Sequence, residues 1–496
     1  LPVVLLANTV LAADDFSALE RYVKFAKKEI GLPTGTAIAI VKDGSIIYQG
    51  NFGYADIKKN KKVTDKTAFY IASITKPMFA LSTLLMEHQG DIKDSTTMAK
   101  MFPQLAFPHI NAQKIQLKHL MSNTSGIENW PMISALAFTG NHNHQQRQKL
   151  MTSSTNDPKV KLGQYRYTNL GFNIVSVWAD EHYQQDWQKT ISELIYQPLG
   201  MTRTSSYMTD ALEKGFEVAR PYSLWSKEPT EIYPFEKSNA TMHGAGGTIA
   251  TASDLARFLI AQLNAGKVDG KQVFPAPVIK KSHQQLAVND LKFNDFVRKG
   301  YAWGWYIGPY KGQAMYHHFG GVEGTHTHSS YMLKHNIGLV VLNNESDISS
   351  QLTNAIADIA YSILLKDGDA DQKADQHIKD IRQSWVDLKP RIQASVVQAA
   401  KRDTERVMVL TENKSKYTGV YHSALWGDLT VELLTSDKFK FTLGGLTAVA
   451  TAYTKPDTMR IQFPVMGGGK VVGYDIAASE IEGLNLMGEY FSKQKL

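Results

Sequence analysis

Apolar positions near the start of the chain follow first a helical and then an alternating spacing. Residues 16–30 repeat apolar side chains at the three- and four-residue intervals of an amphipathic helix. Residues 36–41 and 45–50 are β-rich runs on either side of Lys42-Asp43-Gly44, a combination that predicts a hairpin. From about residue 70 to residue 263 the pattern is mostly that of helices and loops.

Strand patterns return after this helical middle. The expected strands are 304–308, 317–321, 325–333 and 337–342, and a helix is expected over 349–365. Strands at both ends of a segment predict an antiparallel sheet that the two ends complete together. We therefore predict an α/β (α+β) domain over residues 14–366, with a sheet flanked by helices plus a helical subdomain.

The remaining residues have two different patterns. Residues 367–410 are charged and amphipathic, which predicts a helical linker. Residues 411–496 contain short alternating runs separated by turns, which predicts a small C-terminal β-barrel.

Composition narrows the class of protein. A chain of 496 residues suggests two or three domains, and 43% hydrophobic with 20% charged residues is typical of globular proteins. The net charge of +7 comes without a nucleic-acid motif, so we expect no nucleic-acid partner. The sequence has no cysteine, which excludes disulfides, thiol catalysis and cysteine metal sites.

Residues 1–13 are apolar and end in Ala12-Ala13 before Asp14. The run is too short to span a bilayer and has the character of a signal-peptide remnant. It predicts a periplasmic or secreted protein with no transmembrane segment in the mature chain. A buried N-terminal strand is the alternative.

The strongest chemical signal is Ser73-Ile74-Thr75-Lys76 at the start of an apolar helix. Residues three apart share a helix face, so the amine and the hydroxyl lie about one turn from each other. A serine hydroxyl needs a base to become a nucleophile, and a desolvated lysine supplies one. Pro77 fits only the first turn, which places Ser73 at the helix N-terminus.

Two further segments follow in chain order. Tyr167-Thr168-Asn169 lies in the helical middle, and His318-Phe319-Gly320-Gly321 lies in an expected strand. With Ser-x-x-Lys they form the sequence of motifs Ser-x-x-Lys, Tyr-x-Asn and His-x-Gly.

These three motifs resemble those of serine hydrolases grouped with class C β-lactamases: penicillin-binding DD-peptidases, D-aminopeptidases and β-lactamase-fold esterases. The resemblance covers roughly residues 15 to 366 and includes the further landmarks 53–56, 120–126, 198–202 and 246–255. The C-terminal segment resembles the lipocalin-like modules attached to some relatives.

The resemblance implies a role for each motif residue. Ser73 would form an acyl-enzyme, with Lys76 and Tyr167 sharing the proton transfers in an order that the sequence leaves open. Asn169 would orient Lys76 and bind the substrate. The backbone N–H groups of Ser73 and Gly321 would form the oxyanion hole. No cofactor is implied.

The resemblance also makes His318, Phe319 and Gly320 of the third motif candidate substrate-binding or orienting residues. Relatives that destroy β-lactams typically have Lys-Thr-Gly where this chain has His318-Phe319-Gly320, so a cation and a hydroxyl are missing. We therefore expect a small-molecule or peptide substrate, either a peptide with D-residues or a small ester, and little β-lactamase activity. A β-lactamase or penicillin-binding protein is the alternative.

Two other classes remain as alternatives. His317, His318, His326 and His328 cluster in an expected hairpin, but they lack the spacing of a hydrolase metal site, and we expect no metal. A catalytically idle binding or regulatory relative is the second alternative, against which the complete set of motif residues argues. The oligomeric state is left open.

Overall fold

The computed structural model describes residues 14–434 and 438–495. The expected signal-peptide remnant, residues 1–13, lies outside them. The body of the molecule is built on an antiparallel eight-stranded sheet in the order β12-β13-β14-β15-β16-β17-β1-β2. Its strands are β1 (Thr36–Lys42), β2 (Ser45–Phe52), β12 (Ala287–Phe293), β13 (Phe296–Tyr301), β14 (Tyr306–Tyr310), β15 (Gln313–Val322), β16 (Thr325–Met332) and β17 (Ile337–Asn343).

The two ends of this segment complete the sheet together, as predicted. Strand β1 pairs with β2 on one side and with β17 on the other, where Thr36 lies opposite Asn343. The predicted hairpin is confirmed: Asp43 and Gly44 both have positive φ, 50° and 78°, as a two-residue turn between twisted strands requires.

Side chains of β17 alternate between two hydrophobic cores. Leu339 and Val341 pack with helices α1 (Ser17–Ile30) and α13 (Ser349–Leu365). Val340 and Leu342 face the opposite way, toward α11 (Ala252–Leu263) and the core that contains α2 (Thr75–Gln89). Burial on both faces explains why β17 is apolar along nearly its whole length.

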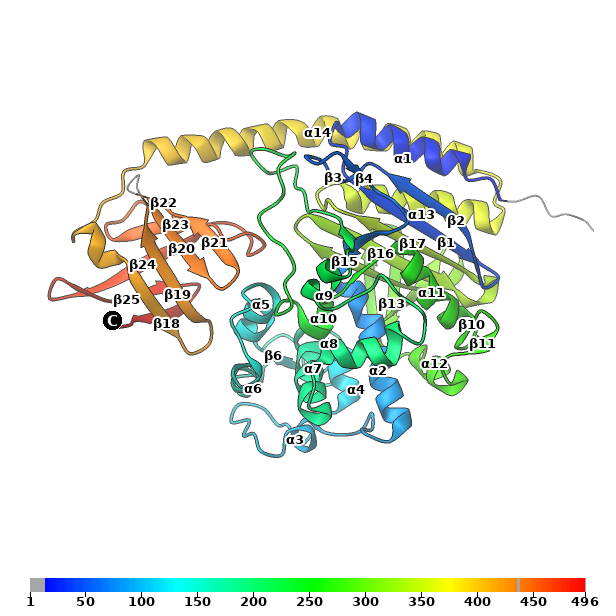
Figure 1. Cartoon of the computed structure of the whole chain (residues 1–496), viewed down its shortest axis with the longest axis horizontal. Coiled ribbons are helices and arrows are strands. Elements are labelled where there is room, and N and C mark those ends of the chain that lie inside the picture. The colour runs from blue at the N-terminus through cyan, green and yellow to red at the C-terminus, as the bar shows by residue number, and fades with distance from the viewer. Residues whose placement is uncertain (1–13, 435–437, 496) are drawn as a thin grey trace, which may run out of the picture.

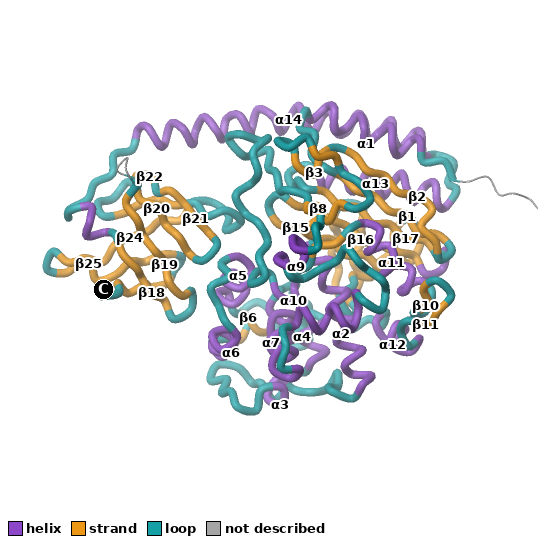
Figure 2. The backbone as a smooth tube through the Cα atoms, viewed as in Figure 1, coloured by secondary structure: helices purple, strands orange, loops and turns teal. Residues whose placement is uncertain are grey.

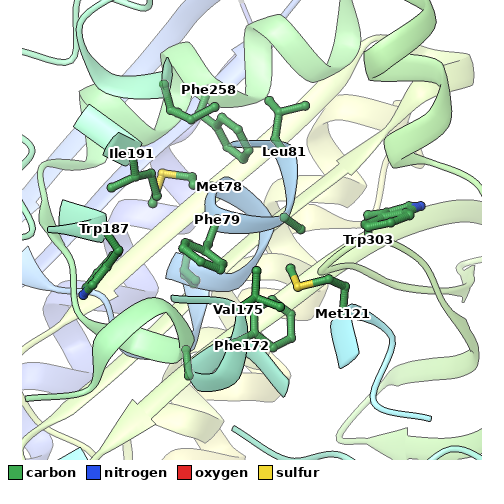
Figure 3. Close-up of a cluster of buried hydrophobic side chains, with 14 of the residues drawn as sticks. Met78, Phe79, Leu81, Met121, Phe172, Val175, Trp187, Ile191, Phe258 and Trp303 are labelled. Carbon is green, nitrogen blue, oxygen red and sulfur yellow. The ribbon is translucent and has the colours of Figure 1, made fainter. Parts of the chain in front are cut away.

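Helix α2 crosses the centre of the second core. Met78, Phe79 and Leu81 pack among aromatic and aliphatic side chains from α7 (Leu170–Tyr183), α8 (Trp187–Ile191) and α11, as Figure 3 shows. Gly90 caps its C-terminus with φ 95°, as its position in the sequence predicts.

The other helices of the body are short. They are α3 (Met98–Met101), α4 (Leu117–Met121), α5 (Trp130–Phe138), α6 (His144–Thr152), α9 (Met208–Glu213), α10 (His243–Gly246) and α12 (Ala276–Ser282). Small ladders join loops between them: β3 (Tyr54–Asp56) with β4 (Lys61–Lys62), β6 (Ile127–Glu128) with β7 (Thr155–Asn156), β10 (Lys267–Val268) with β11 (Lys271–Gln272), and β5 (Thr67–Tyr70) with β8 (Glu217–Val218) and β9 (Ile249–Ala250).

One continuous helix, α14 (Ala370–Glu405), occupies the stretch where a helical linker was expected. Its first half packs on α1, with Ala374 and Ile381 buried and Arg21 paired to Asp371 at 3.0 Å. Its second half extends away from the body toward the C-terminal strands, as the yellow helix in Figure 1 shows. The domain boundaries themselves stay a prediction.

The C-terminal strands form the small β-barrel that the sequence predicts, and Figure 2 shows it as a separate group of strands beside the body. Its nine strands follow the order β21-β20-β19-β18-β26-β25-β24-β23-β22 and nearly close on themselves. Alternation in β20 buries Phe439 and Phe441 in the barrel. The strands are β18 (Gly419–Ser423), β19 (Gly427–Leu433), β20 (Phe439–Leu443), β21 (Leu446–Val449), β22 (Thr451–Ala452), β23 (Thr458–Ile461), β24 (Lys470–Ala477), β25 (Glu480–Leu486) and β26 (Glu489–Lys493).

None of the helices in the described part of the chain is both long enough and apolar enough to cross a membrane.

Candidate active site

Ser73 lies in a single 3₁₀ turn, Ala72–Ile74, that leads directly into α2. The residue before it, Ala72, has φ 46°, a conformation that costs a non-glycine residue free energy. Strained backbone of this kind persists where the surrounding fold holds it, and here it lies next to the candidate nucleophile. Pro77 lies in the first turn of α2, as predicted.

Lys76 is fully buried one helical turn from Ser73. Its Nζ lies 3.0 Å from Ser73 Oγ, 2.7 Å from Asn169 Oδ1 and 2.7 Å from the carbonyl oxygen of Ala245. Among the described residues no carboxylate pairs with Lys76. Burial therefore lowers the pKa of the amine well below its usual 10.5, which favours the neutral form.

A neutral amine has two N–H donors and one lone pair. The Oδ1 of Asn169 and the carbonyl oxygen of Ala245 are both acceptors, so they take the two donors. The third direction, toward Ser73 Oγ, is left to the lone pair. In this state the Ser73 hydroxyl donates to Lys76, which is the arrangement of a nucleophile and its base.

Tyr167 covers the other side of Lys76, whose Nζ lies 5.0 Å from the ring centroid. The residue as a whole is 38% exposed, and its ring stacks on Tyr306 of β14, with centroids 6.2 Å apart. Desolvation, reinforced by Tyr306, raises the pKa of the phenol, and the Ser73 hydroxyl and the Arg298 guanidinium only partly oppose it. The phenol is therefore held protonated.

Asn169 is placed by the start of α7, where it is the residue before the first helical turn. Its carbonyl oxygen accepts from the Asn173 N–H at 3.1 Å, so its backbone is fixed by the helix. The side chain is left free to turn toward Lys76. The structure thus brings Ser73, Lys76, Tyr167 and Asn169 together from two helix starts far apart in the sequence.

Strand β15 forms the opposite wall and carries His318 and Gly320 on the side that faces Ser73. A Cβ on Gly320 would lie 2.1 Å from the Ile71 carbonyl oxygen and 3.1 Å from the Ser73 nitrogen, so only glycine fits there. Pairing of β14 with β15 ends at Tyr306 and His317. Beyond this pair, residues 318–322 have no ladder partner on that edge within the described part of the chain, and Gly321 is exposed.

His318 is buried and neutral. Its Nδ1 lies 2.7 Å from the Phe319 carbonyl oxygen and therefore carries the proton. Its Nε2 is then the acceptor for the Tyr301 hydroxyl at 3.3 Å. Burial lowers the pKa of the imidazole well below its usual value, so His318 supplies no positive charge.

Phe319 is not brought to Ser73. Successive residues of a strand point to opposite faces of the sheet. The centroid of the Phe319 ring lies 4.4 Å from that of His328 and 5.0 Å from that of Phe296, on the face away from Ser73. The expectation that Phe319 itself contacts the substrate therefore finds no support in its position.

The other histidines of the expected hairpin also lie on this far face. His326 Nδ1 contacts Thr353 Oγ1 of α13 at 3.2 Å, and His328 Nε2 contacts Ser330 Oγ at 2.7 Å. Across the described ranges, no three His, Cys, Asp or Glu side chains converge closely enough to hold a metal ion.

Three contributors to the site were not found from the sequence. Ala245 acts through its carbonyl oxygen, which no side-chain pattern reveals. From the sequence, Tyr306 would be interpreted as an aromatic core residue of a strand. Arg298 would be interpreted as a surface residue. In the structure the Arg298 guanidinium lies 3.9 Å from the Tyr306 ring centroid and donates from Nε to His317 Nε2 at 3.3 Å.

A pocket of about 310 Å³ borders the site on the side of Tyr167 and Asn169. Trp130, at the first position of α5, lines it and is 60% exposed. Its other apolar walls are Ile127, Ile133 and Val160. Arg166, Asp157 and Glu128 also line it, but Arg166 is paired with Asp157 and lies 3.8 Å from Glu128, so these charges are compensated among themselves. The pocket suits an uncharged, apolar group.

Comparison with known proteins places this geometry in a family. A family model described as Beta-lactamase matches residues 25–360. Penicillin-binding protein 4* of Bacillus subtilis (strain 168) is 24% identical over 429 residues, which cover 83% of this chain and 88% of the relative.

Solved structures share the fold. The octameric penicillin-binding protein homologue from Pyrococcus abyssi superposes with a TM-score of 0.62 at 20% identity, covering 97% of this chain and 100% of that one. The D-amino acid amidase from Ochrobactrum anthropi SV3, complexed with L-phenylalanine amide, superposes with a TM-score of 0.55 at 17% identity, covering 74% and 99%.

Proposed function

Because the chain belongs to the Beta-lactamase family, whose members here include serine hydrolases, we propose that it hydrolyses an amide or ester through an acyl-enzyme on Ser73. The observation that carries the proposal is the environment of Lys76. Its two acceptors, Asn169 and Ala245, leave the lone pair of a neutral amine aimed at the Ser73 hydroxyl, 3.0 Å away.

The opposite pKa shifts of the two candidate bases support different roles for them. Burial lowers the pKa of Lys76 and raises that of Tyr167. The amine is therefore the group that can accept a proton, and the phenol is the group that can give one. We assign Lys76 as the general base and Tyr167 as the general acid.

The first half of the reaction follows from these roles. Ser73 Oγ attacks the carbonyl carbon while its proton passes to Lys76 Nζ. The carbonyl oxygen becomes negative and is bound by the N–H groups of Ser73 and Gly321. The bond to the leaving group then breaks as Tyr167 donates its proton to that group, and Lys76 returns a proton to Tyr167.

The second half repeats these steps with water as the nucleophile. Water attacks the ester carbon of the acyl-enzyme and gives up a proton to the Lys76–Tyr167 pair. Ser73 leaves with a proton, so the resting site is restored and the acid product departs. No cofactor takes part in this scheme.

The surroundings suggest which substrates fit. The unpaired edge of β15 can take an extended substrate backbone as an added strand. The pocket beside Asn169 can take an apolar acyl side chain, with Trp130 as its platform. We therefore favour peptides, amides or small esters with apolar acyl groups as the substrate class, and the similarity to a D-amino acid amidase supports D-residues among them.

A penicillin-binding role is the second candidate. One relative bears that name, and Arg298 places a cation near Tyr306 where a substrate carboxylate could pair with it. His318, however, is neutral and donates its one N–H to the backbone. We therefore expect β-lactams to react more slowly than apolar esters or amides.

Intact mass after exposure to a fluorophosphonate, and separately to a penicillin, tests the proposal. We expect one adduct per chain from the fluorophosphonate and none with Ser73→Ala. A stable penicillin adduct on Ser73 would favour the second candidate. No adduct from either reagent would falsify the catalytic proposal.

A further inference from the structure

The C-terminal barrel contacts two segments that continue from the walls of the candidate active site. One contact is made at the turn between β15 and β16. Glu323, two residues after Gly321, accepts hydrogen bonds from the Tyr233 hydroxyl and from the backbone N–H of Val465, the latter at 3.0 Å. Val465 belongs to the barrel, in the loop between β23 and β24, and it adopts a left-handed φ of 59°.

That left-handed conformation is costly for a β-branched residue. It is the conformation in which the Val465 N–H meets Glu323 and lies 3.3 Å from the Tyr233 hydroxyl. Gly324, the next residue of the turn, is pressed against the chain on its other side, where a Cβ would lie 2.4 Å from Pro221. The β15–β16 turn is thus held by the barrel through Glu323 on one side and by Pro221 of the body on the other.

The second contact is made at the C-terminal end of α5. The Gly445 N–H donates to the Thr139 carbonyl oxygen at 2.7 Å, and His142 Nε2 donates to the Leu425 carbonyl oxygen at 2.9 Å. Gly444 has φ 57°, and a Cβ there would lie 2.1 Å from the Thr139 oxygen. Only glycine allows this approach of the barrel turn to the body.

These two contacts reach opposite sides of the site. The β15–β16 turn continues the strand that carries Gly320 and Gly321. Helix α5 begins at Trp130, which lines the pocket beside Tyr167 and Asn169. Between the contacts, barrel and body share one buried apolar cluster that includes Trp426 and also Tyr70, three residues before Ser73.

We propose that the barrel braces the active-site cleft, holding the β15–β16 turn through Glu323 and α5 through the Thr139–Gly445 contact, and thereby sets which acyl groups the site accepts. Glu323 is a positioning residue in this scheme, because it acts through strand β15 and touches neither substrate nor the reacting atoms. The inference rests on the proposed function for its effect on substrates, but the brace itself is a property of the unliganded protein.

The brace is tested first without substrate, by hydrogen exchange of the full chain. Glu323→Ala should speed exchange in residues 318–324 by about tenfold, and Glu323→Gln, which keeps an acceptor, should restore most of the protection. Gly444→Ala should speed exchange in residues 130–144. Gly488→Ala is the matched control, since Gly488 also has positive φ but a Cβ there meets nothing within 4 Å.

The consequence for substrates is tested with esters of one leaving group and acyl groups of increasing size. We expect Glu323→Ala and Gly444→Ala to raise KM for the bulky apolar esters about three- to tenfold, with kcat for the acetyl ester within twofold of wild type. Glu432→Gln, an exposed barrel residue paired with Lys440, should change neither constant.

Exchange rates equal to those of the Gly488→Ala control would overturn the brace, whatever the activity. Faster exchange with no change in acyl preference would overturn its role in substrate choice. Failure of wild-type protein to label with fluorophosphonate would instead count against the proposed function and leave the exchange result to stand by itself.

Discussion

The carbonyl oxygen of Ala245 lies 2.7 Å from Lys76 Nζ and accepts one of its protons. A carbonyl oxygen attracts an N–H from either the neutral or the charged amine, but it cannot compensate for the burial of a full charge as a carboxylate does. This contact orients the amine without restoring its normal pKa. The Lys76 amine is therefore both oriented and predominantly neutral, as the proposed role of general base requires.

The first prediction concerns pH. Only neutral Lys76 can accept the Ser73 proton, so kcat/KM should rise with pH and level off well below pH 10.5, since burial lowers the pKa of this amine. Asn169→Asp should move this rise to higher pH, because a carboxylate beside the amine favours its charged form. A pH–rate profile of kcat/KM with one activated ester, recorded for wild type and for Asn169→Asp, measures both the position of the rise and its shift. An unchanged profile in Asn169→Asp would argue against Lys76 as the base.

Lys76→Met should separate activity from stability. The substitution removes the base and should lower kcat/KM by 10³-fold or more. It also removes a buried ionisable group whose pKa is lowered on folding. Below pH 10.5 the unfolded chain binds a proton that the folded chain binds weakly, so the wild-type lysine costs stability there. The melting temperature of Lys76→Met at pH 7 should therefore equal or exceed that of wild type.

Tyr167→Phe tests the general acid through the leaving group. A nitrophenolate leaves without a proton, whereas an amine must be protonated as it leaves. The variant should therefore hydrolyse nitrophenyl esters within about tenfold of wild type and lose 10²- to 10⁴-fold on the matching amide. Equal losses on both substrates would instead indicate that the phenol acts before the leaving-group step.

Trp130→Ala tests the pocket beside Asn169. Loss of the exposed indole should raise KM for phenylacetyl esters more than for acetyl esters, because only the larger acyl group reaches the pocket. Truncating one such aromatic contact costs about 1–3 kcal/mol, which corresponds to roughly 5- to 150-fold. Trp130→Phe, which keeps an aromatic ring, should restore most of the lost affinity for phenylacetyl esters. Equal effects on all acyl groups would place the pocket outside the binding site.

Several features of the fold could be predicted because the residues that determine them are close in sequence. The hairpin at Asp43-Gly44 and the helix Ser349–Leu365 depend on local turn chemistry and periodicity, and the structure has both where expected. Lys76 lies near Ser73 for the same reason, since three residues on a helix set their separation.

Features that depend on register or on main-chain atoms could not be predicted. Phe319 and His318 are neighbours in sequence, yet the strand sends them to opposite faces, and the motif alone does not say which one meets Ser73. The Ala245 carbonyl carries no side-chain signal. The helical linker was predicted from charge and periodicity alone, and α14 runs through Pro390, which is exposed.

The histidines beneath the sheet predict how stability depends on pH. His326 is 7% exposed, and burial lowers the pKa of its imidazole to about 4 from 6.5. The unfolded chain takes up a proton near pH 6.5 and the folded chain does not, so stability is present above pH 6.5 and is lost as pH falls toward 4. This one residue accounts for about 3 kcal/mol over that window at 1.36 kcal/mol per unit of pKa.

His326→Gln should therefore flatten the dependence of the urea midpoint on pH between 6.5 and 4, whereas His109→Gln, at an exposed position, should leave the slope unchanged. Equal slopes for both variants would show that His326 is protonated or solvated in the folded chain.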